Sequence, residues 1–455
     1  MATVEQIDAL VARSKEAQKV IETYSQEKID EIVKMFAKVI FDNAEMFAKM
    51  AVEETRMGVY ENKVAKNLGK ARILWSHLKG KKTRGIINYL EDEGLVEVAK
   101  PMGVVCAATP CTNPIVTPMC NAMFAVKGGN TIIIAPHPRA VKCTAKIKEL
   151  YDAELTKMGV PTDIFMILDI ESVDDTINLM QRCDVVLATG GAGMVKSAYS
   201  SGKPSYGVGP GNVQGIVDED VDFNEAAQKM IASRTFDNGI ICSGDQTIIA
   251  PATKYNEVID AFKANGAFYV DDPAMVDQFR DAIFPGGVMN KNLVGQGVQD
   301  IANAAGIEVP ADTKVIVIKP GTYGPEEVFS KEKMCPVMTA YEYQTWEEAV
   351  AIAKANLLYE GAGHSVSIQS NNKEHVEYAA VELPVSRILI NQICATQNGG
   401  AFTNSLNPTT TLGCGSWGNN AVSENITYYH LFNKSRIAYV KPGYTGQPSD
   451  EEIWG

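Results

Sequence analysis

The chain has 455 residues, of which 45% are hydrophobic and 21% charged, and its 42 basic and 55 acidic residues give a net charge of −13. This length exceeds one ordinary hydrophobic core and predicts two or three domains. The negative charge disfavours a surface for nucleic acid or anionic membranes, and no apolar run reaches the length of a membrane span.

The remaining composition predicts a cytoplasmic protein without a metal. The nine cysteines include no CxxC pair, and none of the five histidines stands at metal-ligand spacing. Neither a disulfide framework nor a zinc site is therefore predicted. Residues 1–22 have the pattern of a charged amphipathic helix, which differs from that of a signal peptide.

Apolar residues in the segment 4–70 recur at intervals of three and four, as at Ile29, Ile32 and Val33, which predicts helices. Beyond it, strand-like and helix-like segments alternate. Strands are predicted over 94–99, 103–108, 131–135, 163–168 and 184–188, and helices over 116–127, 139–158 and 172–181. Alternation of this kind is typical of a mostly parallel sheet with helices on both faces.

A second alternating block runs from about 213 to 390, so two α/β domains are predicted. The segment 85–100 has the pattern of a hairpin that belongs to neither block, and such projecting hairpins often serve subunit contact. Two Gly-rich stretches, 188–198 and 206–212, are candidates for binding a dinucleotide. The first follows a strand and opens a helix, whose free N–H groups and dipole favour an anion.

The stretch FDNGIICSGDQTIIAP, at 236–251, places a single thiol, Cys242, on a Gly-rich segment between a helix and a strand. It overlaps one of six blocks that follow one another in a fixed order. These blocks are TPCTNPIVTPMCNAMFAVKGGNTIIIAPHPRA (109–140), TGGAGMVKSAYSSGKPSYGVGPGN (189–212), DNGIICSGDQTII (237–249), KEKMCPV (331–337), EGAGHS (360–365) and NPTTTLGCGSWGNN (407–420). In them the chain resembles the aldehyde dehydrogenase superfamily, specifically its CoA-acylating branch, over essentially its whole length.

The resemblance implies an α/β fold with a Rossmann-like cofactor domain, an α/β catalytic domain and a small oligomerisation element. The cofactor-binding domain is expected over 1–84 and 103–210, and the catalytic domain over 211–426. The oligomerisation element is expected over 85–102 and 427–455. A homodimer or homotetramer is the expected assembly.

Cys242 matches the nucleophile of this family. Its thiolate would add to an aldehyde carbonyl to give a thiohemiacetal, and after hydride transfer to the nicotinamide a thioester would remain on the enzyme. Asn113 matches the asparagine whose amide, with the N–H of the nucleophile itself, holds the developing oxyanion. If Cys242 is not the nucleophile, Cys111 and Cys394 are the next candidates. The other cysteines are expected in the core or at positions that the family does not use: Cys106, Cys120, Cys143, Cys183, Cys335 and Cys414.

An absence distinguishes this chain from hydrolytic relatives. Those relatives carry a water-activating glutamate 34 residues before the nucleophile, a position that Val208 occupies here. Water attack on the thioester therefore lacks its activator, whereas a thiol needs less help because a fraction of it is thiolate near neutral pH. The resemblance thus implies a reversible, NAD(P)-dependent oxidation of an aldehyde to its acyl-CoA, with coenzyme A as co-substrate.

The resemblance also assigns a cofactor site. Glu332 matches a glutamate that hydrogen-bonds the nicotinamide ribose, and Ala135 replaces a lysine that hydrolytic relatives place near the adenine ribose. In the acylating branch this adenosine pocket is expected to accept NAD(P) and CoA in turn. Arg139 is then a candidate for a phosphate of NADP or CoA, or an exposed arginine without such a role. The expected cofactor-binding residues are Thr109, Pro136, His137, Arg139, Thr189, Gly190, Gly191, Gly209, Glu332 and Pro336.

The substrate tail is predicted from Lys66 and Lys70, which stand four apart and share one helix face. In similar enzymes this helix borders the substrate entrance, so one of the two would meet a carboxylate or sulfonate; the alternative is a solvated face. Arg387 would serve the same end or pair with an acid. The expected substrate-contacting residues are Lys66, Lys70, Ser243, Arg387 and Thr396.

Three aldehydes remain open as substrates, namely succinate semialdehyde first, then sulfoacetaldehyde and acetaldehyde. The loop 392–405 is expected to line the aldehyde pocket. His364 either assists deprotonation of the CoA thiol or is a buried, hydrogen-bonded histidine. An acetaldehyde enzyme would be of the single-function form, because the chain ends without an alcohol dehydrogenase half. A non-catalytic assembly subunit is disfavoured because Cys242, Asn113 and Glu332 are all present.

Overall fold

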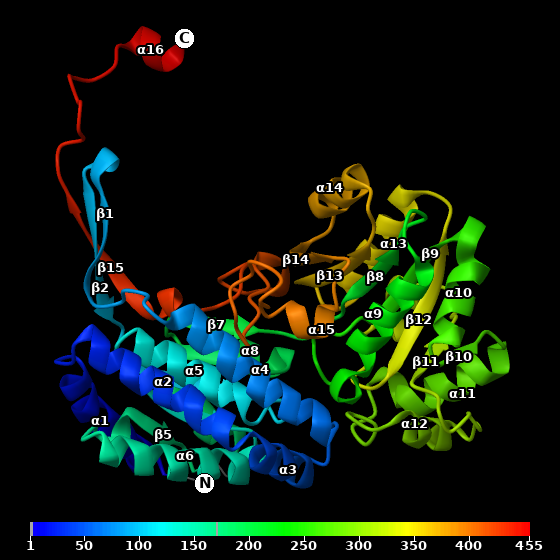
Figure 1. Ribbon diagram of the computed structural model, residues 1–455, viewed down its shortest axis with the longest axis horizontal. Coiled ribbons are helices and arrows are strands. Elements are labelled where there is room, and N and C mark those ends of the chain that lie inside the picture. The colour runs from blue at the N-terminus through cyan, green and yellow to red at the C-terminus, as the bar shows by residue number, and fades with distance from the viewer. Residues whose placement is uncertain (1–2, 170–171) are drawn as a thin grey trace.

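The strands form three separate sheets (Figure 1). A computed structural model describes residues 3–169 and 172–455; residues 1–2 and 170–171, which fall in the first predicted domain, lie outside the described part. Two of the sheets are parallel and covered by helices on both faces, and the third is antiparallel. The predicted α/β class, with two alternating blocks and a separate hairpin, is confirmed.

The first sheet has five parallel strands in the order β5-β4-β3-β6-β7. Its strands are β3 (Val104–Thr109), β4 (Thr131–Pro136), β5 (Phe165–Ile167), β6 (Val185–Thr189) and β7 (Ser205–Val208). From β3 the chain builds outward through β4 and β5, and it then returns to the other side of β3 with β6. In open parallel sheets, this reversal opens a crevice at the carboxyl ends of the strands, where nucleotides commonly bind.

Successive residues of β3 face opposite sides of this sheet, as in any strand. Val105 and Ala107 pack with α2 to α6, whereas Cys106 packs with α7 and α8; α1 contributes to both layers. The helices are α1 (Val4–Ile21), α2 (Gln26–Asp42), α3 (Ala44–Thr55), α4 (Tyr60–Leu78), α5 (Val116–Lys127), α6 (Val141–Lys157), α7 (Val173–Met180) and α8 (Ala192–Tyr199). The helix expected from residue 139 begins at Val141, because residues 138–140 form a separate 3-10 turn that starts at a proline.

The second sheet has seven parallel strands in the order β10-β11-β12-β9-β8-β13-β14. Its strands are β8 (Gln214–Val217), β9 (Thr247–Pro251), β10 (Ala267–Val270), β11 (Val315–Ile318), β12 (Val337–Tyr343), β13 (Gly363–Gln369) and β14 (Val385–Ile390). One face packs on α9 (Phe223–Thr235) and α10 (Tyr255–Ala264). The other packs on α11 (Pro273–Ile283), α12 (Val298–Ala305), α13 (Trp346–Tyr359) and α14 (Lys373–Glu382).

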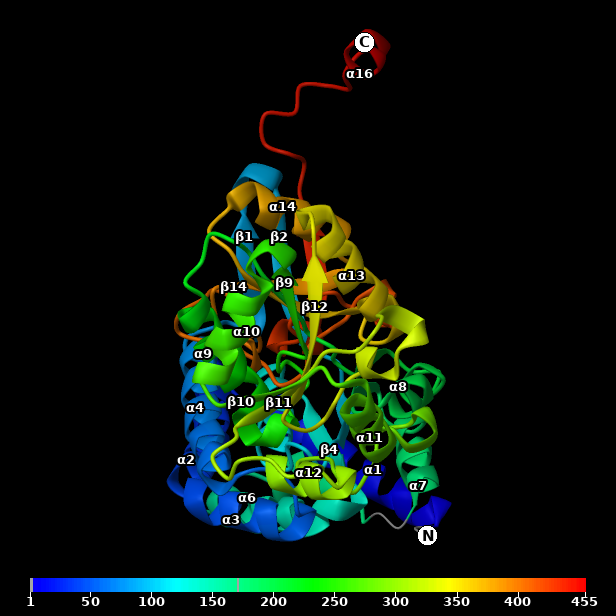
Figure 2. The same cartoon turned by 90° about the vertical axis from the view of Figure 1, so that its right-hand side faces the viewer.

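The third sheet joins the predicted hairpin to the end of the chain. β1 (Gly85–Leu90) and β2 (Leu95–Pro101) pair with each other, and β15 (Phe432–Ala438) pairs antiparallel with β2. Beyond β15 the chain stands clear of the body and ends in the short helix α16 (Asp450–Trp454), as Figures 1 and 2 show. Within the described residues, no helix combines the length and the apolar character needed to cross a membrane.

The two parallel sheets meet end to end. Val208, the last residue of β7, belongs to an apolar cluster against which Cys242, which precedes β9, packs. The carboxyl end of the first sheet therefore adjoins the amino end of the second, and the predicted nucleophile lies at this junction.

Candidate active site

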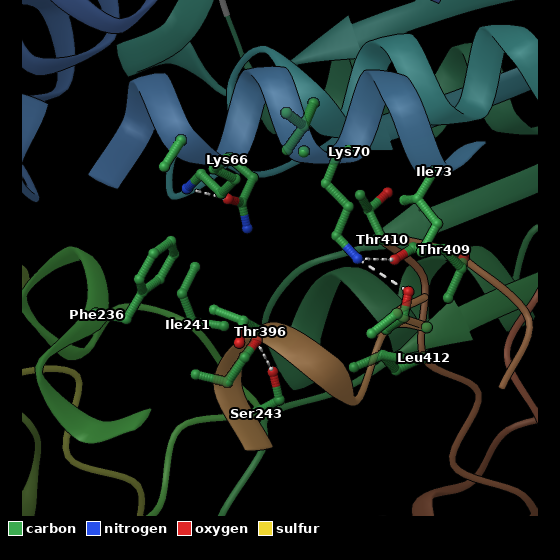
Figure 3. A pocket seen from close by; sticks show the side chains of 18 of the residues that line it. Lys66, Lys70, Ile73, Phe236, Ile241, Ser243, Thr396, Thr409, Thr410 and Leu412 are labelled. Carbon is green, nitrogen blue, oxygen red and sulfur yellow. Dashed lines mark hydrogen bonds between the residues drawn. The ribbon is translucent and has the colours of Figure 1, made fainter. Parts of the chain in front are cut away.

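A cavity of about 450 Å³ lies at this junction (Figure 3). Its walls come from α4, from the loop between β3 and α5, from the segment before β9, and from the stretches 395–402 and 409–412. Part of the loop 392–405 therefore lines the cavity, as predicted. Six of the predicted catalytic and substrate residues share it, namely Lys66, Lys70, Asn113, Cys242, Ser243 and Thr396.

Cys242 is half-buried and packs against an apolar wall of Val208, Leu412 and Cys414. Burial raises the pKa of its thiol to about 12, and the neighbouring Glu332 carboxyl acts in the same direction. The thiol is therefore protonated at neutral pH, and it must lose its proton before it can act as a nucleophile.

The backbone around Cys242 is held by two features. A Cβ at Gly211 would lie 2.0 Å from the carbonyl oxygen of Cys242, so only glycine lets these two segments approach. The buried Arg234 guanidinium donates hydrogen bonds to the carbonyl of Gly239 and, at 3.4 Å, to that of Asp245. The Arg234 side chain thus provides hydrogen-bond donors for two carbonyls that are not paired with a neighbouring strand.

The turn before the nucleophile is strained and anchored by charge. Asp237 and Asn238 both have left-handed backbones, with φ of 55° and 52°. The fully buried Asp237 carboxylate accepts hydrogen bonds from Lys63 Nζ at 3.0 Å, Lys66 Nζ at 2.7 Å and the Val59 N–H at 2.8 Å. Although burial raises the pKa of Asp237, the two lysines outweigh it and hold the pKa below its ordinary value.

The two lysines predicted for substrate have different partners. Both extend from α4 toward the cavity (Figure 3), so the alternative of a solvated face is wrong. Lys66 Nζ also donates to Asn113 Oδ1 at 2.5 Å. Lys70 donates to the backbone carbonyls of Gly399 at 2.9 Å and Thr409 at 3.3 Å, and burial lowers the pKa of Lys70 to about 8.

Two further predicted substrate residues lie below these lysines in Figure 3. The buried Ser243 hydroxyl donates to the carbonyl of Ala395 at 3.0 Å, which ties the nucleophile segment to the loop 392–405. Thr396 lies exposed in the same loop and lines the cavity.

Arg387 and His364 do not line this cavity. Arg387 lies within β14, instead of before it, and donates to the carbonyls of Gly413 at 2.8 Å and His364 at 2.7 Å. No acid pairs with it in the described part of the chain, so that alternative is wrong. Among the described residues neither ring nitrogen of the buried His364 has a hydrogen-bond partner, which contradicts the expected hydrogen bond. Burial and, second, Arg387 lower the pKa of His364 to about 3, so its ring is neutral.

The predicted cofactor residues lie along the carboxyl edge of the first sheet. Thr109 ends β3, Pro136 ends β4 beside it in register, and Thr189 ends β6. His137 and the exposed Arg139 follow β4, Gly190 and Gly191 precede α8, and Gly209 follows β7. This is the reversal point of the strand order, so these residues fit a dinucleotide held across the crevice.

Glu332 and Pro336 come from the other side of the junction, just before β12. Pro336 is buried, whereas Glu332 is half-buried. Burial, followed by the neighbouring Glu360, raises the pKa of Glu332 to about 8. The Glu332 carboxyl also raises the pKa of the Cys242 thiol, after burial.

Sequence reasoning missed three buried residues that support the backbone around the site, namely Asp237, Lys63 and Arg234. The letters DNG at 237–239 are typical of left-handed turns. They do not reveal that the carboxylate is buried against a helix near the start of the chain. Arg234 looks like an ordinary charge in the last turn of a helix.

Comparisons with known proteins show which family this chain resembles in sequence and in fold. Residues 1–403 match the aldehyde dehydrogenase family. The chain is 57% identical to a protein of Clostridium kluyveri named succinate-semialdehyde dehydrogenase (acetylating), and the match covers 99% of each chain. It is 37% identical to a sulfoacetaldehyde dehydrogenase of Acholeplasma sp, over 98% of this chain and 93% of that one. The solved structure of an acetylating aldehyde dehydrogenase from Geobacillus thermoglucosidasius superposes with a TM-score of 0.93 at 37% identity, over 98% of each chain.

The protein belongs to the aldehyde dehydrogenase family. It is accordingly an oxidoreductase that acts on aldehydes. The resemblance inferred from the six sequence blocks is confirmed.

Proposed function

We propose that this protein oxidises succinate semialdehyde to succinyl-CoA, reversibly, with NAD(P) as hydride acceptor and coenzyme A as acyl acceptor. The observation that carries the acylating reaction is the packing of Cys242 against the apolar cluster of Val208, Leu412 and Cys414. Val208 stands in this cluster at the position where hydrolytic relatives hold their water-activating acid. That position therefore supplies no base to activate water.

The protein's own residues account for the covalent steps. The Cys242 thiolate adds to the aldehyde carbonyl, and the resulting oxyanion accepts hydrogen bonds from the Asn113 amide and the Cys242 N–H. NAD(P)+, when bound, accepts the hydride that leaves the former aldehyde carbon. The thioester on Cys242 is then open to attack by the CoA thiol. The buried His364 does not line the cavity, and burial lowers its pKa to about 3, so its ring is a poor acceptor for the proton of that thiol.

Lys70 is the proposed partner of the substrate's charged end. It lines the cavity that contains Cys242, and in the described part of the chain no carboxylate pairs with it. A cation satisfied only by carbonyl groups, in a largely apolar cavity, favours an anionic ligand. The Clostridium kluyveri relative supports succinate semialdehyde, and the Acholeplasma relative keeps sulfoacetaldehyde as the second candidate. Acetaldehyde, with no charged end, comes third.

The domain roles follow from this proposal. The unit of the first sheet, over 1–84 and 103–210, is proposed to bind NAD(P) and CoA in turn along its carboxyl edge. The unit over 211–426 supplies the nucleophile. The third sheet, with the segments 85–102 and 427–455, is proposed to join copies into a homodimer or homotetramer. Its support is the exposure of apolar side chains on the C-terminal segment, at Tyr439, Val440 and Trp454. A cytoplasmic location is part of the same proposal.

Product analysis tests the acylating reaction. With succinate semialdehyde and NAD(P)+, we expect succinyl-CoA to form only when CoA is added, with little succinate when it is omitted, because Val208 supplies no base to activate water. Nicotinamide absorbance and mass spectrometry of the products provide the measurement. Rapid formation of succinate without CoA would contradict the proposal.

Lys70→Met tests the assignment of the substrate. A charge-assisted hydrogen bond is worth about 1.5–3 kcal/mol, which corresponds to a loss of about 10- to 150-fold in kcat/KM for succinate semialdehyde. Butyraldehyde, which is uncharged and of similar length, should be nearly unaffected. Steady-state kinetics with both aldehydes measure the difference, and an equal loss for both would contradict a role in charge recognition.

Lys49→Met is a control, because it removes a positive charge from the neighbouring helix α3 and Lys49 does not line the cavity. Lys49 Nζ pairs with Glu53 on the surface at 3.9 Å, and its loss should not discriminate between the two aldehydes. A second readout is pH. Since the pKa of Lys70 is lowered to about 8, its charge is present below pH 8 and lost above it. The kcat/KM for the anionic aldehyde should fall through that pH, and this step should disappear in Lys70→Met.

A further inference from the structure

Lys66 joins two parts of the active site that are far apart in the sequence. Its ammonium group donates to Asn113 Oδ1 at 2.5 Å and to Asp237 Oδ2 at 2.7 Å. Asn113 is the proposed oxyanion donor, and Asp237 anchors the strained turn five residues before Cys242. One side chain thus fixes both the amide and the turn that carries the nucleophile.

The chemistry of lysine decides which way the Asn113 amide faces. An ammonium group has three donors and no acceptor, so only the oxygen of the amide can lie against it. The amide nitrogen is therefore directed elsewhere. Within residues 3–169 and 172–455, Asn113 Nδ2 makes no hydrogen bond, and Asn113 lines the cavity, so this donor is open to an acceptor there.

The charge at this place favours an oxyanion. Lys63 and Lys66 both contact the one carboxylate of Asp237, so the cluster carries a net positive charge. Lys66 is 9% exposed and Asp237 fully buried, so water screens this charge weakly. A cation on Asn113 Oδ1 also polarises the amide and makes its N–H groups stronger donors.

We propose that Lys66 is a positioning residue for aldehyde oxidation, which orients and polarises the Asn113 amide while its bond to Asp237 holds it in place. The proposal rests on the proposed thioester chemistry. It differs from the expected role of Lys66 in binding the substrate's charged end, because an oxyanion forms from every aldehyde. Its effects should therefore be the same for charged and uncharged substrates.

A double-mutant cycle tests this role, with kcat measured for succinate semialdehyde and butyraldehyde. Removing an oxyanion donor costs about 10²- to 10³-fold in kcat, and misdirecting it should cost a part of that, about 10- to 100-fold for Lys66→Met. Because Lys66 acts through Asn113, the same substitution in an Asn113→Ala background should lower kcat by less than about threefold. KM for both aldehydes should change little.

Lys63→Met is the matched control. It removes a buried lysine from the same helix and the same carboxylate, but Lys63 does not contact Asn113. Both lysine variants should lower the thermal unfolding midpoint, whereas only Lys66→Met should lower kcat by tenfold or more. Lys66→Arg keeps donors for both partners and should recover most of the lost rate. It also keeps the proposal testable should Lys66→Met not fold.

Four outcomes would overturn the proposal. The first is an equal loss on Lys66→Met in both backgrounds, and the second is an equal loss of kcat in Lys63→Met. The third is a loss confined to the anionic aldehyde, and the fourth is no recovery with Lys66→Arg. Failure of the proposed function would be separately visible, because the wild-type protein would then not form acyl-CoA from succinate semialdehyde. The cycle would still run on any aldehyde that it does oxidise.

Discussion

Replacing Cys242 with alanine is expected to abolish both aldehyde oxidation and acyl-CoA reduction, with a loss of at least about 10⁴-fold in kcat. No covalent intermediate can form without the thiol, since Cys242 is the one cysteine among the residues that line the cavity in the described chain. The measurement is nicotinamide absorbance at saturating substrates in both directions. Incubation with succinyl-CoA alone should add an acyl group to the wild-type protein, by mass, and none to Cys242→Ala.

Cys414→Ala is the control for this experiment. Cys414 is buried beside Cys242 but does not line the cavity, so its loss should leave acyl transfer in place. Substantial turnover by Cys242→Ala would move the nucleophile to Cys111 or Cys394. Cys394 is buried, and Cys111, although half-buried like Cys242, does not line the cavity.

Gly211→Ala is expected to lower kcat by about 10²- to 10³-fold although residue 211 carries no reacting group. The new Cβ would lie 2.0 Å from the Cys242 carbonyl oxygen and 2.8 Å from its carbon, so the backbone of the nucleophile must shift. A misplacement of about 1 Å can cost about 10²-fold, and the oxyanion donor on the same backbone moves as well. Single-turnover formation of the acyl-enzyme measures the loss directly.

Gly321→Ala is the matched control, because a Cβ at that position meets no atom within 4 Å. It should leave kcat unchanged. An unimpaired Gly211→Ala protein would mean that the two segments can separate without disturbing the site.

Much of the fold could be predicted from local patterns. The strands ending at Thr109, Pro136 and Thr189 are apolar segments flanked by turns and helices, and their alternation with helices requires a parallel sheet. The grouping of the predicted cofactor residues at one edge of the sheet could also be predicted, because parallel strands have their carboxyl ends at the same edge. The hairpin at 85–100 was predictable because its two strands are neighbours in the sequence, whereas the pairing of β2 with β15 was not. A contact more than 300 residues away leaves no local pattern, as the Lys434–Glu97 pair across these strands illustrates.

The site was predictable in its chemistry and less so in its contacts. The residue types at Cys242, Asn113 and Lys70 indicate a nucleophile, a donor and a cation, and the fold brings all three to one cavity. The partner of each group depends on distant backbone. Lys66 and Lys70 stand four residues apart and lie on the same face of one helix. Lys66 nevertheless donates to Asn113 and Asp237, whereas Lys70 donates to two backbone carbonyls. Only the folded chain distinguishes them.

The buried set of Lys63, Lys66 and Asp237 restricts the order in which this sequence can change over generations. Losing the carboxylate first would leave two ammonium groups facing each other in a dry interior, at a cost of about 3–5 kcal/mol, which is a large part of the stability of most proteins. Losing one lysine first leaves a balanced pair. A loss of this arrangement is therefore expected to begin at one of the two lysines and not at the carboxylate, so changes in a helix precede changes in a turn 174 residues further along the chain.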